Sequence, residues 1–229
     1  MRLAALLSGG KDSLYALYQE QQKGHDIKLI ITFLSENQES YMFHTPNIHL
    51  VAEQAKLMNI PIVQIKTKGE KEKELEDIRA VLRKQKTEID GVVTGATASN
   101  YQKSRIDAIC HELELASLAP LWNAPPEQTL RRMVADGFRI MIVAVAAPPL
   151  DETWLGRIVN AACIDDLVAL NKKYGIHILF EGGEAESLVL DCPLFSKQMI
   201  VVSAEKQWDI KTRSGRLAIT DVSFKEKSQ

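Results

Sequence analysis

Six residues near the start of the chain, Ser-Gly-Gly-Lys-Asp-Ser at 8–13, have the groups needed to bind phosphate. The apolar run at residues 3–7 before them predicts a buried strand, and the spacing of Leu14 and Leu17 after them predicts a helix. Glycines between a strand and a helix let the backbone approach a phosphate closely, and the first N–H groups of the helix can bind it. The pattern therefore predicts a phosphate-binding loop.

The side chains of this loop suit the same chemistry. Ser8 and Ser13 can donate O–H hydrogen bonds, and Lys11 can neutralise phosphate charge. Asp12 would repel a phosphate unless a divalent cation lay between them, so it predicts bound Mg²⁺. Neither the G-x-x-x-x-G-K-[ST] nor the G-x-G-x-x-G spacing is present, and the alternative is a plain strand-to-helix turn. The predicted cofactor-binding residues are Ser8, Gly9, Gly10, Lys11, Asp12 and Ser13, of which Lys11 and Asp12 are also candidates for catalysis and Asp12 for the metal.

A second glycine turn follows a later apolar run, at residues 92–99. Gly95 and Ala96 are predicted to pack against the nucleotide, because glycine permits a close approach of the backbone. Tyr101, Gln102 and Arg105 on the next helix are candidates for substrate binding, and Arg105 could bind a phosphate or carboxylate with two N–H groups. The alternative is a packing turn of small residues followed by an exposed arginine.

The stretch Glu-Gly-Gly-Glu-Ala-Glu-Ser at 181–187 places three carboxylates near one glycine turn. Their mutual repulsion suggests a bound cation, which could be Mg²⁺, ammonium or a quaternary amine. A solvated acidic hairpin is the alternative. The candidates from this stretch are Glu181, Glu184 and Glu186 for catalysis, and Gly182, Gly183 and Ser187 for substrate binding.

The elements that must position these residues alternate between strand and helix. Predicted strands lie at 3–7, 27–34, 62–65 and 92–94, and predicted helices include 48–58, 75–82 and 101–113. This alternation predicts an α/β domain with a parallel sheet covered on both faces. Ligands of such sheets bind outside the carboxyl ends of the strands, where both glycine turns fall.

The character of the sequence changes near residue 120, where three prolines surround Trp122. We expect a first domain at 1–120 and a smaller α+β domain at 121–229. Within the second domain the apolar runs predict strands at 137–146, 176–180, 199–202 and 217–224, and a helix ending near 174.

The composition excludes several classes of protein. The net charge of −2 and the pI near 6.2 disfavour a basic protein that binds nucleic acid non-specifically. The three cysteines are scattered and form no CxxC pair, which disfavours a disulfide framework and a cysteine-rich zinc site and suits the cytoplasm. No stretch is long enough to span a membrane, so we expect no membrane association. Among the histidines, His44 beside a proline is the best candidate for substrate binding, whereas His49 and His177 are expected to be structural.

Taken together, these segments resemble the diphthine–ammonia ligase family of the PP-loop superfamily, the adenine-nucleotide α-hydrolases. The resemblance covers nearly the whole chain, and its most specific segment is the one that begins at Glu181. The matching segments are SGGKDS at 8–13, YMFHTPNIHL at 41–50, VTGATASNYQKSR at 93–105, LAPLW at 118–122, DETWLGR at 151–157, NKKYGIH at 171–177 and EGGEAESLVLDCPLF at 181–195.

The resemblance implies a fold and a reaction. The fold is a HUP-type Rossmann-like domain, which would bind ATP, followed by a family-specific domain for the substrate. ATP would adenylate the carboxylate of diphthine, a modified histidine on elongation factor 2, and ammonia would displace AMP to give diphthamide. Lys11, the loop N–H groups and Mg²⁺ would stabilise charge on the phosphates, and a carboxylate at 181, 184 or 186 would bind ammonium and accept its proton.

The resemblance leaves alternatives open. Ala185 stands where family members usually carry an aromatic residue, which would suit the quaternary ammonium of diphthine, and Trp122 or Trp154 could supply the ring instead. Three other functions are possible. The enzyme could act on another carboxylate or on a tRNA base, or the protein could be a nucleotide sensor without turnover. The acidic pI disfavours the tRNA reading, and Asp12 with the glutamates disfavours the sensor. Whether two copies form a homodimer stays open.

Overall fold

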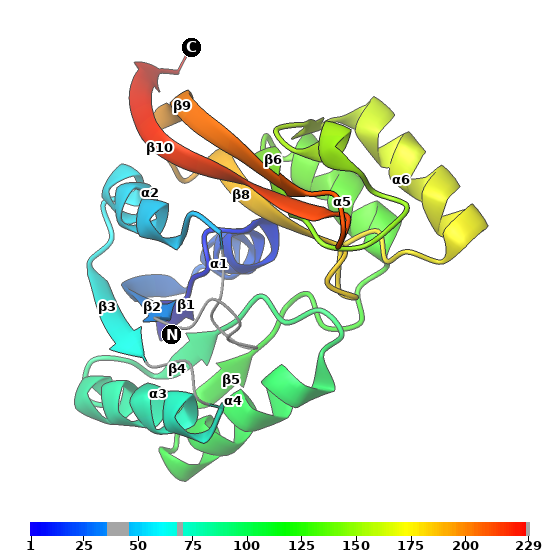
Figure 1. Ribbon diagram of the computed structural model, residues 1–229. Helices are drawn as coiled ribbons and strands as arrows, with labels where there is room; N and C mark the ends of the chain where they lie inside the picture. Colours follow the sequence, from blue (N-terminus) through cyan, green and yellow to red (C-terminus); the bar gives the residue numbers. More distant parts are fainter. Residues whose placement is uncertain (36–45, 68–70, 228–229) are drawn as a thin grey trace. The chain divides into compact units, whose positions relative to one another are not determined.

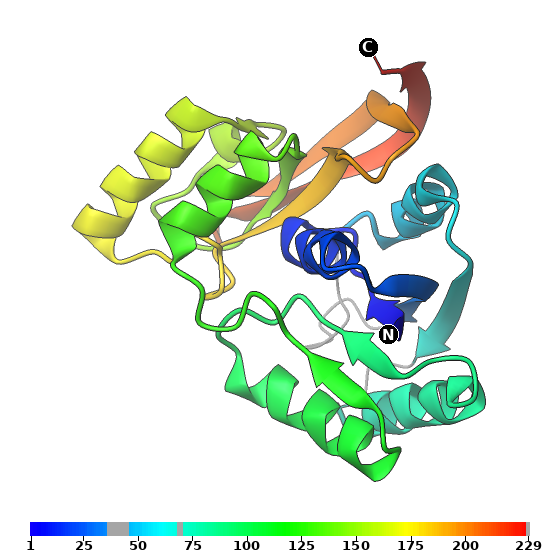
Figure 2. The same ribbon diagram turned by 180° about the vertical axis from the view of Figure 1, so that it is seen from behind.

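The computed structural model describes residues 1–35, 46–67 and 71–227 (Figures 1 and 2). The chain divides into two compact units, and each is described by itself. The first unit comprises Met1–Ser8 and Asp12–Asn123, and the second comprises Gly9–Lys11 and Ala124–Gln229. The short segment Gly9–Lys11 therefore belongs to the second unit by its contacts, although the residues on either side of it belong to the first.

The first unit is built on a five-stranded sheet in the order β3-β2-β1-β4-β5. All four pairs of neighbouring strands are parallel, which confirms the predicted α/β architecture. The strands are β1 (Arg2–Leu6), β2 (Asp26–Ser35), β3 (Ile62–Thr67), β4 (Gly91–Val93) and β5 (Ala116–Leu118). The helices are α1 (Lys11–Gln22), η1 (Ile48–Leu50), α2 (Val51–Met58), α3 (Lys71–Gln85) and α4 (Asn100–Glu112).

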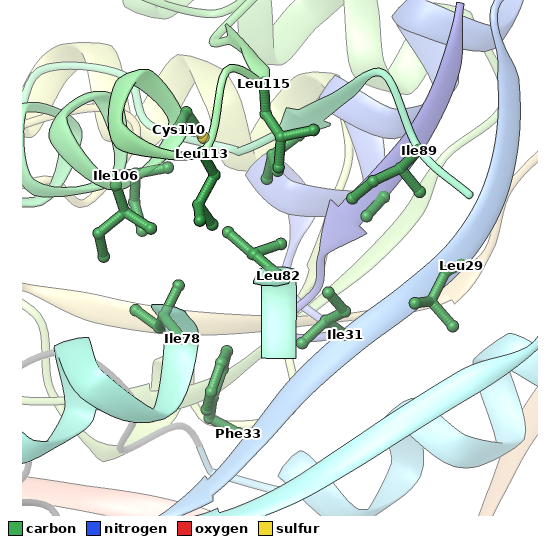
Figure 3. Close-up of a cluster of buried hydrophobic side chains, with 13 residues drawn as sticks. Leu29, Ile31, Phe33, Ile78, Leu82, Ile89, Ile106, Cys110, Leu113 and Leu115 are labelled. Carbon is green, nitrogen blue, oxygen red and sulfur yellow. The ribbon is translucent and has the colours of Figure 1, made fainter. Parts of the chain in front are cut away.

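A cluster of buried apolar side chains joins α3 and α4 to one face of this sheet (Figure 3). Ile78 and Leu82 of α3 and Ile106 of α4 meet Ile31 and Phe33 of β2, and none of these five side chains is more than 5% exposed. Helix α1 lies on the opposite face (Figures 1 and 2), where Leu14 and Leu17 are fully buried. Covering both faces is what parallel strands with continuous apolar runs require.

The second unit is built on another five-stranded sheet, with the order β7-β6-β10-β9 and β8 also paired to β6. Its strands are β6 (Arg139–Val145), β7 (Ile158–Val159), β8 (Ala185–Asp191), β9 (Lys197–Asp209) and β10 (Ser214–Glu226), all paired antiparallel. Its helices are α5 (Pro126–Ala135), η2 (Glu152–Trp154) and α6 (Ala161–Tyr174). Strand β6 is central, because it pairs with three other strands and buries Ile140, Ile142 and Val143 completely.

One predicted strand of the second unit is wrong. The apolar run at 176–180 forms a turn, in which the N–H of Phe180 donates to the carbonyl of His177 at 2.8 Å. Phe180 has a φ of +65°, which is incompatible with a strand. The run is apolar because Ile178, Leu179 and Phe180 are buried, and burial does not depend on sheet pairing. The nearby strand is β8, which begins at Ala185.

Within the described ranges, no helix combines the length and the apolar character needed to cross a membrane.

Candidate functional site

The loop at 8–13 joins β1 to the first turn of α1, at the carboxyl end of a parallel strand. Gly9 has a φ of +82°, a conformation that glycine adopts without strain. The N–H of Ser8 donates to Oγ of Ser13 at 3.2 Å, and the two hydroxyl oxygens lie 3.1 Å apart. The two serines therefore join the residues after β1 to the first turn of α1, which begins at Lys11.

The turn after β4 lies directly against the first turn of α1, within the first unit. A Cβ added at Gly95 would lie 2.4 Å from the backbone N of Ser13 and 2.6 Å from the carbonyl carbon of Asp12. Only glycine permits this approach. The structure therefore brings the turn at Gly95 against Asp12 and Ser13 of the first motif, and Ala96 is half-buried beside Gly95.

The segment Gly9–Lys11 is held by residues of the second unit to which it belongs. The carbonyl of Gly9 accepts from the N–H of Val189 at 3.1 Å, and the N–H of Lys11 donates to Oγ of Ser187 at 3.2 Å. The Lys11 side chain is 2% exposed. Its Nζ donates to the carbonyl of Leu179 at 2.8 Å and lies 5.0 Å from the ring centroid of Phe180. These contacts compensate the buried charge of the ammonium group.

The turn at residues 177–184 of the second unit, which includes Leu179 and Phe180, also positions Glu184. Oε1 of Glu184 accepts from the N–H of His177 at 2.7 Å, and the carbonyl of Glu184 accepts from the N–H of Ala146 at 2.9 Å. A Cβ added at Gly182 would lie 2.6 Å from Oε1, so the carboxylate lies over the backbone of the turn. His177 has the structural role expected for it, because its Nδ1 accepts from the N–H of Leu179 at 3.3 Å.

The three glutamates of this stretch have different surroundings. Glu184 is buried, Glu181 is half-buried in the turn, and Glu186 is exposed on β8, so the expectation that all three crowd one turn is wrong. The reason is the period of a strand, which carries residue 186 to the solvent side while Ala185 and Ser187 point inward. In the part of the chain that the structure describes, no group of three or more His, Cys, Asp or Glu side chains could hold a metal ion.

The predicted substrate-binding residues of α4 form a pair on one face of the helix. The guanidinium carbon of Arg105 lies 3.5 Å from the ring centroid of Tyr101, four residues earlier, and its Nη1 donates to the carbonyl of Tyr101 at 3.3 Å. Arg105 is therefore a stacked side chain rather than a simple exposed charge. The side chain of Gln102 and the whole of His44 lie outside the described residues.

Each tryptophan that could replace an aromatic ring at 185 already has a cation of this chain over its ring. Nζ of Lys103 lies 5.4 Å from the ring centroid of Trp122, and the guanidinium carbon of Arg157 lies 4.4 Å from that of Trp154. Ala185 itself is 4% exposed on β8. On the ring face that it occupies, each of these cations would compete with a quaternary ammonium.

Sequence reasoning missed the residues that contact the segment Gly9–Lys11 within the second unit, namely Leu179, Phe180 and Val189. Their roles use two backbone groups and one ring face, which leave no characteristic residue type in the sequence. The only signal was position, because all three flank the acidic glycine stretch that the sequence singled out.

Comparison with known proteins gives matches to both parts of the chain. The family model described as the diphthamide synthase N-terminal domain matches residues 1–117, and the one described as the diphthamide synthase C-terminal domain matches residues 125–222. A human protein named diphthine–ammonia ligase is 39% identical over 227 residues, and the match covers 90% of this chain and 84% of the human protein. The mouse protein of the same name is 38% identical, with the same coverage.

Among solved structures, a crystal structure described as a predicted subunit of tRNA methyltransferase from Methanocaldococcus jannaschii is similar to this chain. The TM-score is 0.46 and the sequence identity 16%, with 84% of this chain and 98% of the other covered.

Proposed function

The chain belongs to the diphthamide synthase family, and we propose that it uses ATP to join ammonia to the carboxylate of diphthine. The observation that carries the proposal is the close packing of the turn at Gly95 against Asp12 and Ser13 of α1, in a chain whose two halves both match this family. The products would be diphthamide, AMP and pyrophosphate. The first unit would bind ATP, and the second would bind the acceptor.

The loop at 8–13 is the proposed site for the phosphates of ATP. Gly9 and Gly10 have no side chain that would keep phosphate oxygens from the backbone, and N–H groups at the start of α1 would donate to them. Gly95 and Ala96 would flank the nucleotide from the neighbouring turn, since residue 95 lies against the first turn of α1. Lys11 would add positive charge through its ammonium group, one donor of which is bound to Leu179.

The chemistry requires an activated carboxylate. A carboxylate is a poor acyl donor, because its oxygen is a poor leaving group until it carries AMP. The carboxylate oxygen would attack the α-phosphorus of ATP, and the bond from that phosphorus to the bridging oxygen would break to release pyrophosphate. Clamped phosphates and fixed N–H donors stabilise the charge that develops in this step.

Asp12 is the proposed ligand for Mg²⁺. It occupies the first turn of α1, and the residue is half-buried, with its Oδ1 itself buried. When bound, the ion would screen the negative charge of the phosphates. One carboxylate with phosphate oxygens and water is the usual protein contribution to a Mg²⁺–nucleotide site.

The proposed acceptor is the diphthine residue of elongation factor 2, with ammonium as the nitrogen source. Tyr101, Arg105, Gln102 and His44 are the proposed contacts to this substrate, together with Gly182, Gly183 and Ser187. We also propose a cytoplasmic location, because the three cysteines form no disulfide among the described residues. We also propose that two copies of the chain can associate as a homodimer.

The test is release of pyrophosphate from ATP in the presence of Mg²⁺ and ammonium, with and without elongation factor 2 that bears diphthine. We expect release to require the factor and to fall by about 100-fold in Lys11→Met, which keeps the apolar stem and removes the ammonium group. Lys84→Ala is the matched control, because Lys84 is exposed on α3. Thermal melts of each variant separate loss of folding from loss of chemistry.

Each outcome of this assay distinguishes the proposed ligase from one of the alternative functions. Release with the factor, and amide formation in step with it, supports the ligase. Tight ATP binding without release would overturn it in favour of a sensor or of another acceptor. Release driven by tRNA in place of the factor would support the nucleic-acid alternative.

A further inference from the structure

We propose that Glu184, and neither Glu181 nor Glu186, binds the ammonium substrate through Oε2 and accepts its proton. This inference rests on the proposed function and assigns one step of it to one atom. It concerns only the second unit, where the turn at 177–184 holds the side chain.

The two carboxylate oxygens of Glu184 differ in their hydrogen bonding. Oε1 accepts from the N–H of His177 at 2.7 Å. Oε2 is buried and has no hydrogen-bond partner among the described residues, and the residue as a whole is 8% exposed. A buried carboxylate oxygen without a donor destabilises the protein, so its retention calls for an explanation. A small cation that donates N–H bonds would satisfy it.

The backbone fixes where this carboxylate lies. A Cβ at Gly182 would lie 2.6 Å from Oε1 and 3.1 Å from Oε2, so both oxygens lie against the turn, in space that any side chain at 182 would fill. The N–H of Gly183 donates to the carbonyl of Phe180 at 3.1 Å, and that of Ala146 donates to the carbonyl of Glu184. The turn is therefore tied at both ends, and Oε2 is held in a fixed place before ammonium arrives.

The other two carboxylates are poorer choices for this role. Glu186 is exposed on β8 and Glu181 is only half-buried. An exposed carboxylate interacts weakly with a monovalent cation, because water screens the charge and competes for the hydrogen bonds. Burial strengthens the interaction at Glu184. One carboxylate also suits ammonium better than a divalent ion, which requires more oxygen ligands than this turn supplies.

The step that follows is balanced by two proton transfers. Ammonium is the main form at neutral pH, and it cannot attack until it loses a proton. That proton passes to Oε2, and the lone pair so released forms the C–N bond with the acyl carbon of the adenylate. The bond from that carbon to the oxygen bearing AMP breaks, and AMP leaves with the electron pair. The amide nitrogen gives its extra proton to water, and Glu184 returns its own proton to solvent.

The experiment separates adenylation from amide formation. Exchange of labelled pyrophosphate into ATP, in the presence of diphthine-bearing elongation factor 2, reports adenylation. Amide formation is measured against ammonium, and against hydroxylamine, which is largely unprotonated at neutral pH and needs no base. In Glu184→Gln we expect exchange to stay within about twofold of the unmodified chain, and amide formation with ammonium to fall on the order of 100-fold. Activity with hydroxylamine should be largely kept.

Two further variants test whether the effect is specific to the position of the Glu184 carboxylate. Gly182→Ala displaces only the flexible end of the Glu184 side chain, so it should reproduce the loss with ammonium while exchange persists. Glu205→Gln removes an exposed carboxylate on β9 and should change neither activity. An unchanged dependence on ammonium in Glu184→Gln, or a selective loss in Glu181→Gln or Glu186→Gln instead, would overturn the assignment. Absence of exchange in the unmodified chain would overturn the proposed function itself.

Discussion

The cysteine thiols show how burial governs reactivity at single residues. Cys110, Cys163 and Cys192 are all buried and none is in a disulfide. Burial raises the pKa of the Cys110 thiol to about 11 and that of Cys192 to about 12, and it also raises the pKa of Cys163. The thiolate is the reactive form, so at pH 8 roughly one Cys110 in a thousand is ionised.

We therefore expect the folded protein to react very slowly with a thiol reagent such as dithionitrobenzoate at pH 8. In guanidinium chloride all three thiols should react rapidly, because unfolding restores both exposure and the ordinary pKa. The measurement is the absorbance of the released thiolate with time, with and without denaturant. Rapid reaction of one thiol in the folded protein would show that its burial is not maintained in solution.

Single residues also mark the limit of prediction from the sequence. The SGGKDS spacing correctly predicts a turn between a strand and a helix, because glycine conformation and helix start are local properties. The bond from Lys11 to Leu179 could not be predicted, since the partners are 168 positions apart and the acceptor is a backbone carbonyl. The same holds for the burial that distinguishes Glu184 from Glu186.

At the scale of elements, the contact between α1 and the turn after β4 depends on one glycine. A Cβ at residue 95 would meet the backbone of Asp12 and Ser13, which cannot give way as a side chain can. In Gly95→Ala we expect the start of α1 to shift from the turn, with ATP affinity lowered by about tenfold or more and stability lowered by about 1–3 kcal/mol. Calorimetric titration with a non-hydrolysable ATP analogue and urea unfolding would measure the two effects.

The control for this variant is Ala98→Ser, a small change at an exposed position of the same turn. It should leave both affinity and stability close to those of the unmodified chain. ATP affinity unchanged in Gly95→Ala, despite a measurable loss of stability, would show that the turn packs the helix without contributing to the nucleotide site.

Hydropathy predicted the elements of the first unit better than those of the second. In the first unit the four predicted runs are strands of the parallel sheet, whereas the short strand β5 (Ala116–Leu118) was not predicted. In the second, the run at 176–180 is apolar because it is buried in a turn, whereas β8 begins within an acidic segment and could not be seen as a strand. Strand β8 forms through its register with β6, in which Ala185 pairs with Val145. Such pairing depends on residues distant in sequence.

At the scale of the whole molecule, stability in acid depends on the balance between carboxylates and cations. The chain has 30 Asp and Glu residues and 28 Lys and Arg residues, so protonation of the carboxylates leaves a large positive charge. An ion pair that lowers the pKa of a carboxyl group keeps it ionised to lower pH, and so opposes the loss of stability in acid. Nη2 of Arg2 lies 2.7 Å from Oδ1 of Asp90, and the N–H of Arg2 donates to Oδ2 at 2.7 Å. These bonds join the start of β1 to the residue before β4.

The hydrogen bonds from the Arg2 side chain, and then that from its backbone, lower the pKa of Asp90 from 3.8 to about 2. Because the folded pKa lies below the unfolded one, the pair stabilises the protein above about pH 4, and the contribution is lost as the pH falls towards 2. We expect Asp90→Asn to lower the melting temperature at pH 6 by a small amount, since the pair is exposed. The difference in melting temperature from the unmodified chain should shrink as the pH falls towards 2 and disappear below it. A difference that stays constant from pH 6 to pH 2 would assign the effect of the substitution to shape rather than to charge.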